Sequence, residues 1–112
     1  LAERLLASVG VAIPVPESLQ DAVTAVSGSG PAYVFFLAEA MTAAAVELGL
    51  DLEIATRMVN HTILGAATLL EGSGEPAEVL RRNVTSPNGT TAAAISASSV
   101  SSVVPMDSAY PE

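Results

Sequence analysis

Hydrophobic and polar residues alternate in two ways near the start of this chain, and each pattern predicts a different element. Residues 1–8 have the spacing of a short helix, and the β-branched run VGVAIPV after them is typical of a strand. No later segment supplies a second strand, and a lone strand leaves its backbone donors and acceptors unpaired. We therefore expect residues 1–16 to be the tail of a neighbouring sheet domain.

Residues 17–49 predict two consecutive helices. Apolar side chains recur every three or four positions from residue 17, with Ser18 as N-cap and Gly28 as the stop. Pro31 suits the first turn of the next helix and Gly49 suits its end. The polar side chains of that long helix are Glu39, Thr42 and Glu47. Such a helix must be covered nearly all round, and we expect a second identical chain to cover it.

The remainder of the chain predicts further helices. Asp51 caps a long amphipathic helix, SGEP interrupts the chain after it, and another helix begins at Pro76. The turn TSPNGTT then leads into a final helix. Beyond Ile95 the sequence becomes serine-rich without a charged face, so we expect residues 96–112 to form an atypical, disordered tail.

Composition agrees with an all-α fold and excludes several functions. Half of the 112 residues are apolar and only 4% are aromatic, which favours closely packed helices in one domain. A net charge of -8 would repel nucleic acid. With no cysteine and one histidine, we expect no metal site. The acidic residues in the long apolar helix argue against a membrane span, and the lack of cysteine fits a reducing compartment such as the cytoplasm.

Two stretches could carry chemistry. SGSGPAY lacks the third glycine of a dinucleotide-binding loop and the lysine of a phosphate-binding loop, so a hinge between helices is the favoured interpretation. In VTSPNGTTA, a tight turn precedes two threonines that open a helix, and this combination could hold an anion. A capped helix after a proline turn explains the same residues without a ligand. His61 is expected at the surface, and Glu39 is expected to meet a hydroxyl or a helix end.

Two longer blocks carry a resemblance to a known family. DAVTAVSGSGPAYVFFLAEAM and HTILGAATLLEGSGEPAEVLRRNVTSPNGTTAA closely resemble the C-terminal domain of pyrroline-5-carboxylate reductase, and the resemblance covers residues 1–95. It implies a helical dimerisation domain of the 6-phosphogluconate dehydrogenase C-terminal-like type at 17–95, after the end of a Rossmann domain at 1–16. Asn88 replaces a glycine that is usual in the family, and the tail 96–112 departs from the family pattern.

The resemblance also implies an activity and a set of site residues. The family reduces 1-pyrroline-5-carboxylate to proline with NADPH or NADH, as a homodimer or a higher homo-oligomer. Substrate-binding positions correspond to Ser86, Gly89, Thr90 and Thr91, and the Thr91 hydroxyl would lie nearest the imine nitrogen as the catalytic group. The positions that face the nicotinamide correspond to Asn83 and Val84. The chain lacks the nucleotide-binding domain, so we expect it to be inactive alone. The rival hypothesis is a non-catalytic helical dimerisation module.

Overall fold

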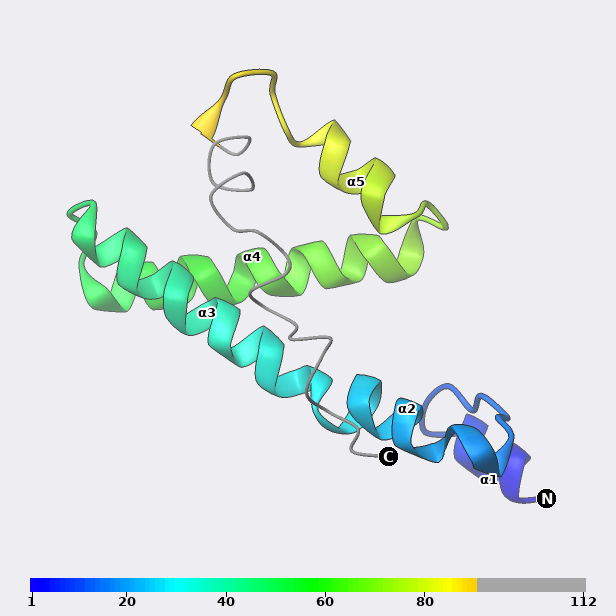
Figure 1. Ribbon diagram of the computed structural model, residues 1–112. Helices are drawn as coiled ribbons and strands as arrows, with labels where there is room; N and C mark the ends of the chain where they lie inside the picture. Colours follow the sequence, from blue (N-terminus) through cyan, green and yellow to red (C-terminus); the bar gives the residue numbers. More distant parts are fainter. Residues whose placement is uncertain (91–112) are drawn as a thin grey trace, which may run out of the picture. The chain divides into compact units, whose positions relative to one another are not determined.

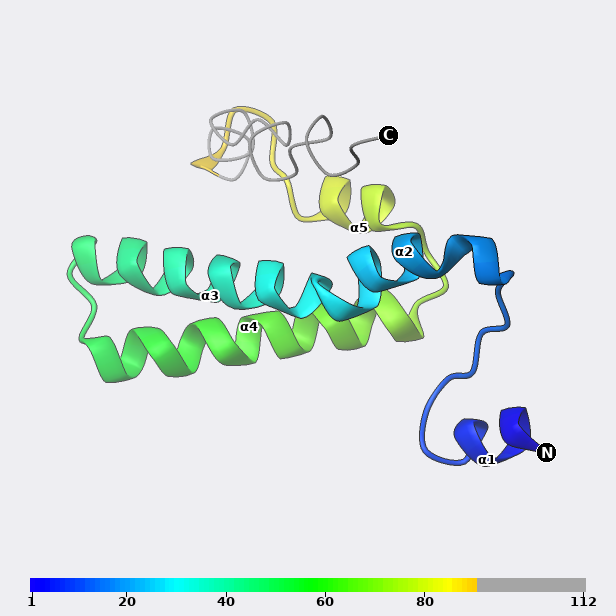
Figure 2. The same ribbon diagram turned by 60° about the horizontal axis from the view of Figure 1, so that its bottom comes forward.

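The chain is helical over the part that the structure describes. A computed structural model describes residues 1–90, which contain helices and turns and no strand (Figure 1 and Figure 2). The chain divides into two compact units, Leu1–Thr62 and the residues from Ile63 onward. These observations confirm the all-α class. The helix predicted after the turn TSPNGTT and the tail 96–112 lie outside the described residues.

The first unit begins with a short helix and an extended segment. Helix α1, Ala2–Ala7, ends at Ser8, whose hydroxyl donates to the Leu5 carbonyl oxygen at 2.6 Å. Residues 11–16, which come next, are neither helical nor paired in a sheet. The predicted strand is therefore not formed in the described residues, because no second strand is present to accept and donate its backbone hydrogen bonds.

A nearly continuous helical stretch then runs from Glu17 to Glu47. It comprises a 3₁₀ turn η1 (Glu17–Leu19), helix α2 (Gln20–Val23), a π-helical turn η2 (Thr24–Gly28) and helix α3 (Gly30–Glu47). The prediction that Ser18 caps this stretch is wrong. The Leu19 N–H donates to the Pro16 carbonyl oxygen at 3.0 Å, so the first turn starts at Pro16 and Ser18 lies inside it.

Helix α3 ends at a glycine, as the sequence predicts. Gly49 has a φ of +103°, and its N–H donates to the Val46 carbonyl oxygen at 2.9 Å. The Leu50 N–H donates to the Ala45 carbonyl oxygen at 3.1 Å. This pair of bonds is a Schellman motif, which satisfies carbonyl groups left free at the helix end. The reversal lets α3 run antiparallel to the first half of the next helix (Figure 2).

Helix α4, Leu52–Gly72, begins at the predicted cap and contains the two buried residues of the described part. The Asp51 carboxylate accepts from the Glu53 N–H at 3.1 Å, which confirms Asp51 as the N-cap. Ala55 and Val59 are 0% and 5% exposed. They lie four residues apart and so share one face of α4.

The second unit continues α4 into a bend and a short helix. Gly74 has a φ of +71°, and the Glu75 N–H donates to the Ser73 hydroxyl at 3.1 Å, so the chain turns here. Helix α5, Ala77–Asn83, comes after Pro76, which is its N-cap residue. The structure therefore confirms the predicted break at SGEP and the helix predicted after it.

Helix α3 leaves an unusually large apolar surface exposed in a single chain. None of its residues is buried, and Phe35 and Phe36 are 70% and 65% exposed. By length and composition alone, the stretch Glu17–Glu47 could also cross a membrane. A surface of this kind marks a place that another molecule covers.

Candidate functional site

The candidate site is a tight turn just after α5. The Gly89 N–H donates to the Ser86 carbonyl oxygen at 3.1 Å, with Pro87 and Asn88 between them. Asn88 has a φ of +57°. Proline at the second position and a positive φ at the third are the features of a type II turn. Asparagine adopts this left-handed conformation more readily than other side chains, so it fits where glycine would be expected.

Gly89 fits tightly against the start of the turn. A Cβ atom placed on Gly89 would lie 3.2 Å from the Ser86 carbonyl oxygen and 3.3 Å from the Ser86 Cβ. A side chain here would push the turn open. The Gly89 N–H is engaged in the turn itself. Gly89 therefore gives the turn its tight shape, and its assignment as a substrate-binding residue stays a prediction.

The end of α5 fixes the segment that leads into the turn. The Thr85 hydroxyl donates to the Arg81 carbonyl oxygen at 2.6 Å, and the Thr85 N–H donates to the Arg82 carbonyl oxygen at 3.2 Å. Thr85 is half-buried. The sequence pattern alone does not single out this residue, although a threonine just after a helix is a usual partner for its last carbonyl groups. Thr85 anchors the turn to the helix.

The predicted site residues lie on one continuous segment. Asn83 is the last residue of α5, and Val84 is its C-cap, with 70% of its surface exposed. Ser86 and Thr90 are exposed and Gly89 is half-buried. Thr91 lies outside the described residues. Val84, Ser86 and Thr90 are thus close in sequence and exposed in the part of the chain that the structure describes.

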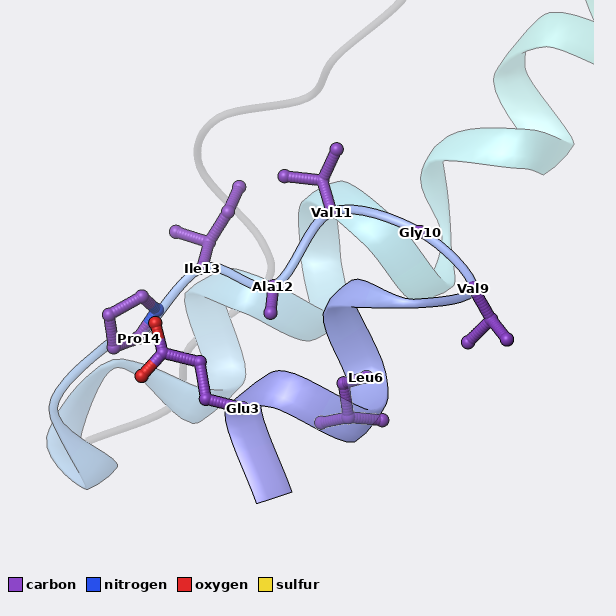
Figure 3. A pocket seen from close by; sticks show the side chains of 8 residues that line it. All are labelled: Glu3, Leu6, Val9, Gly10, Val11, Ala12, Ile13 and Pro14. Carbon is purple, nitrogen blue, oxygen red and sulfur yellow. The ribbon is translucent and has the colours of Figure 1, made fainter. Parts of the chain in front are cut away.

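Several hollows lie among the residues of the first unit. One is formed by α1 and the segment after it, where Val11 and Ile13 extend to one side and Ala12 to the other (Figure 3). The Glu3 carboxylate is the one polar side chain of its lining, and the other lining residues are apolar. A second hollow, between α3 and the first half of α4, includes Glu39. The Glu39 side chain is exposed, and its expected contact with a hydroxyl or a helix end stays a prediction.

His61 lies on the exposed side of α4. It lines a shallow hollow with Ile54, Arg57 and Met58, all from the same helix. Within the described residues, no three histidine, cysteine or carboxylate side chains come close enough to hold a metal ion. The surface position of His61 agrees with the prediction.

A family model matches most of the chain. Residues 17–104 match the family described as pyrroline-5-carboxylate reductase dimerisation. The matched range begins at the start of the η1 turn and includes the beginning of the segment 96–112.

Curated relatives and solved structures agree with that match. A pyrroline-5-carboxylate reductase of Pseudomonas aeruginosa is 58% identical over 96 residues, covering 84% of this chain and 35% of the relative. A pyrroline-5-carboxylate reductase of Arabidopsis thaliana is 44% identical over 91 residues, covering 81% and 33%. The chain thus spans about a third of the length of these relatives.

Two solved structures have the same fold over most of the chain. A pyrroline-5-carboxylate reductase from Coxiella burnetii aligns with a TM-score of 0.79 and 41% identity, covering 86% of this chain and 36% of that one. A pyrroline carboxylate reductase of Plasmodium falciparum with NADP bound aligns with a TM-score of 0.74 and 33% identity, covering 86% and 39%.

Proposed function

This chain belongs to the family of pyrroline-5-carboxylate reductase dimerisation domains, and we propose that it works in the reduction of 1-pyrroline-5-carboxylate to proline. The observation that supports this most directly is the type II turn at Ser86–Gly89, which leads into the two threonines. It combines a tight glycine with hydroxyl groups in six consecutive residues, where the sequence predicts that a helix begins. Such a segment suits a small carboxylate better than a bulky ligand.

The substrate carboxylate is proposed to bind at the start of the helix after the turn. The first N–H groups of a helix have no partner within it, and the helix dipole favours a negative charge there. Ser86 and Thr90 are exposed in one chain and can present hydroxyl groups to the same anion. Gly89 keeps the turn tight and leaves the space beside the Ser86 carbonyl group free of side-chain atoms.

Thr91 is the proposed catalytic residue. Its hydroxyl would donate a hydrogen bond to the imine nitrogen, which draws electron density from the neighbouring ring carbon. That carbon then accepts a hydride more readily, and the nitrogen takes up a proton. Thr90 and Ser86 would hold the carboxylate so that the imine is oriented toward the hydroxyl.

The described residues contain no glycine loop between a strand and a helix, which is the element that binds the phosphates of a nicotinamide cofactor. NADPH or NADH, when bound, supplies the hydride. Asn83 and Val84 are the proposed contacts to the nicotinamide, and the exposed Val84 side chain offers an apolar surface for the ring. We propose that residues 1–16 end a nucleotide-binding domain and that residues 17–95 form the helical domain.

A second copy of the chain is the proposed partner of α3. The side chains of Tyr33, Val34, Phe35, Phe36 and Leu37 are all exposed in one copy. Because a helix has 3.6 residues per turn, these five consecutive side chains point in all directions, and a second copy packed along α3 would bury them. A cytoplasmic homodimer is proposed in preference to a membrane span, since Glu39 and Glu47 lie along the same helix.

The proposed reaction can be tested by joining this chain to the nucleotide-binding domain of the Pseudomonas aeruginosa relative. The fused protein should oxidise NADPH when 1-pyrroline-5-carboxylate is added. Thr91→Ala should lower kcat by about 10²-fold, as expected for loss of one hydrogen-bond donor to the reacting group. Thr68→Ala is the matched control, because the Thr68 hydroxyl bonds only to its own helix, at the Leu64 carbonyl oxygen.

The alternative function is a non-catalytic dimerisation module. A folded, dimeric fusion protein that never oxidises NADPH would support this alternative and contradict the reductase. Unchanged kcat in Thr91→Ala, with an active parent, would overturn only the role of that hydroxyl.

A further inference from the structure

Glu39 and Asn60 line the same end of a hollow between helices α3 and α4. The hollow lies within the first unit, and no residue of its lining is positively charged. Val46 and Leu52 line it next to the connection between the two helices. Glu39 and Asn60 each lie about two turns farther from that connection on their own helix. A carboxylate on α3 and an amide on α4 are therefore presented on one side of the helix pair.

The polar side chains of this hollow differ in what they can donate. The Thr42 hydroxyl donates its hydrogen to the Ala38 carbonyl oxygen at 2.8 Å, so this hydrogen is used within α3. An ionised carboxylate such as that of Glu39 only accepts hydrogen bonds, whereas the amide nitrogen of Asn60 has two hydrogens to donate. Glu39 and Asn60 are both exposed. The hollow thus presents an acceptor and a donor to a molecule that covers it.

Glu39 lies next to the two phenylalanines on the surface of α3. Phe35 and Phe36 precede it by four and three residues, and this spacing makes them its neighbours on the helix. A second copy that covers these rings also takes the Glu39 carboxylate out of water. Enclosing a carboxylate without a hydrogen-bond donor carries a large free-energy penalty. A favourable pairing of two chains therefore brings a donor to Glu39.

The hollow itself contains a donor that a second copy can bring. In a dimer with two-fold symmetry, the same surface patch of both chains meets, and each contact occurs twice. Laying this hollow against its copy places each Glu39 beside the Asn60 of the second copy, and both contacts form together. Pairing α3 with α3 at Glu39 would instead bring two carboxylates together, and like charges repel. The patch is therefore complementary to itself through α3 and α4.

We propose that Glu39 and Asn60 fix the register of the homodimer, with the Glu39 carboxylate of each copy accepting a hydrogen bond from the Asn60 amide of the other. The proposal rests on the proposed homodimer and deepens it. Both residues lie in the range 17–104 that matches the dimerisation family. Apolar attraction has no direction, so the apolar side chains of α3 permit several relative positions of the two chains. An enclosed polar pair is satisfied in one position and so selects it.

The first test mixes two variant chains. Tagged Glu39→Ala and untagged Asn60→Ala are combined, and native mass spectrometry measures the mixed and unmixed dimers. A mixed dimer holds one complete contact, whereas every contact in the unmixed dimers lacks one partner. We expect the mixed dimer to exceed random mixing at least about tenfold, as a hydrogen bond to a charged group predicts. The matched control pairs Asn60→Ala with Glu47→Ala, a carboxylate on α3 outside the hollow, and should mix randomly.

The possible results separate this proposal from the proposed function. Random mixing of Glu39→Ala with Asn60→Ala in chains that form dimers would overturn the proposal, because a contact within one chain is lost in the mixed and unmixed dimers alike. Chains that stay monomeric at every concentration would contradict the homodimer and the proposal together. Neither result depends on the reductase reaction, so an inactive fused enzyme would leave an observed preference for mixed dimers in support of the register.

The second test measures how the two chains are arranged. The chain contains no cysteine, so His61→Cys gives each copy one attachment point for a spin label on the exposed side of α4. Electron-spin distance measurements should give one distance between the labels in this labelled parent, and the same distance after Glu39→Gln, which keeps an acceptor oxygen. Glu39→Leu should remain dimeric and give a broad or divided distribution of distances. A single, unchanged distance in Glu39→Leu would overturn the role in register.

Discussion

Helices α3 and α4 are consecutive and have similar lengths, yet they differ in which side chains they expose to solvent. Helix α3 has apolar side chains on every side and no buried residue. Helix α4 has charged and amide groups on one side and holds Ala55 and Val59, the buried residues of the part that the structure describes. An amphipathic helix can lie at the surface of a domain, whereas a helix that is apolar all round must be enclosed. The contrast indicates that α3, and not α4, is the helix whose apolar side chains need a covering partner.

A charge placed on α3 should have the largest effect. Phe36→Asp changes a residue that is mostly exposed in one chain, so a monomer would tolerate it. If a second copy covers Phe36, the buried carboxylate should raise the dimer dissociation constant at least about 100-fold, or about 2.8 kcal/mol. Sedimentation equilibrium measures this change. The control is Thr56→Asp on the exposed side of α4, and equal effects of both variants would remove the distinction between the helices.

A smaller loss is expected from truncating the buried face of α4. Val59→Ala removes two methyl groups from a site that is already covered in one chain. At about 0.8 kcal/mol per group plus a cavity term, the free energy of unfolding should fall by about 2 kcal/mol. Urea denaturation at fixed chain concentration provides the measurement. A loss below about 0.5 kcal/mol would mean that this face is not packed in solution.

Replacing each of two glycines by alanine should change the stability of the fold in opposite directions. Gly49 needs its positive φ to end α3, so Gly49→Ala should destabilise the fold by about 1 to 2 kcal/mol. Gly65 lies inside α4 with open space where a Cβ would be placed, so Gly65→Ala should stabilise it by about 0.5 to 1 kcal/mol. Melting temperatures of the two variants measured side by side should move in opposite directions. Movement in the same direction would contradict the assigned helix end.

The smallest effect is expected at the N-cap of α4. Asp51→Ala removes the carboxylate that accepts from the Glu53 N–H, and should cost about 1 kcal/mol. Asp51→Asn keeps an acceptor at the same place and should retain most of the stability. If both variants unfold at the same urea concentration as the parent, the cap does not contribute to the stability of α4.

Local signals in the sequence predict several helix ends but not the path of the chain before α3, where the predicted cap at Ser18 is wrong. Gly49, Asp51 and Pro76 mark helix ends by chemistry that involves only a few neighbouring residues, and the sequence predicts all three. The turn at Asn88 is predictable for the same reason. The wide turn at Thr24–Gly28 is not predictable, because the sequence of this stretch is equally compatible with an unbroken α-helix.

The candidate site is predictable only as a segment. The sequence identifies the turn and its threonines, and the structure adds the anchoring by Thr85 and the tight fit of Gly89. The surroundings of the turn cannot be predicted from local sequence, because they depend on segments distant along the chain or in another copy. Ser86 and Thr90 are exposed in the part that the structure describes.

The central claim is that α3 is enclosed by a second copy of the same chain, and dilution tests it most directly. Sedimentation equilibrium should give twice the mass of one chain at micromolar concentration, and circular dichroism should show helix content falling as the chain is diluted and the dimer separates. A monomer that keeps its full helix content at every concentration would contradict the claim, because α3 would then be stable in water without a partner.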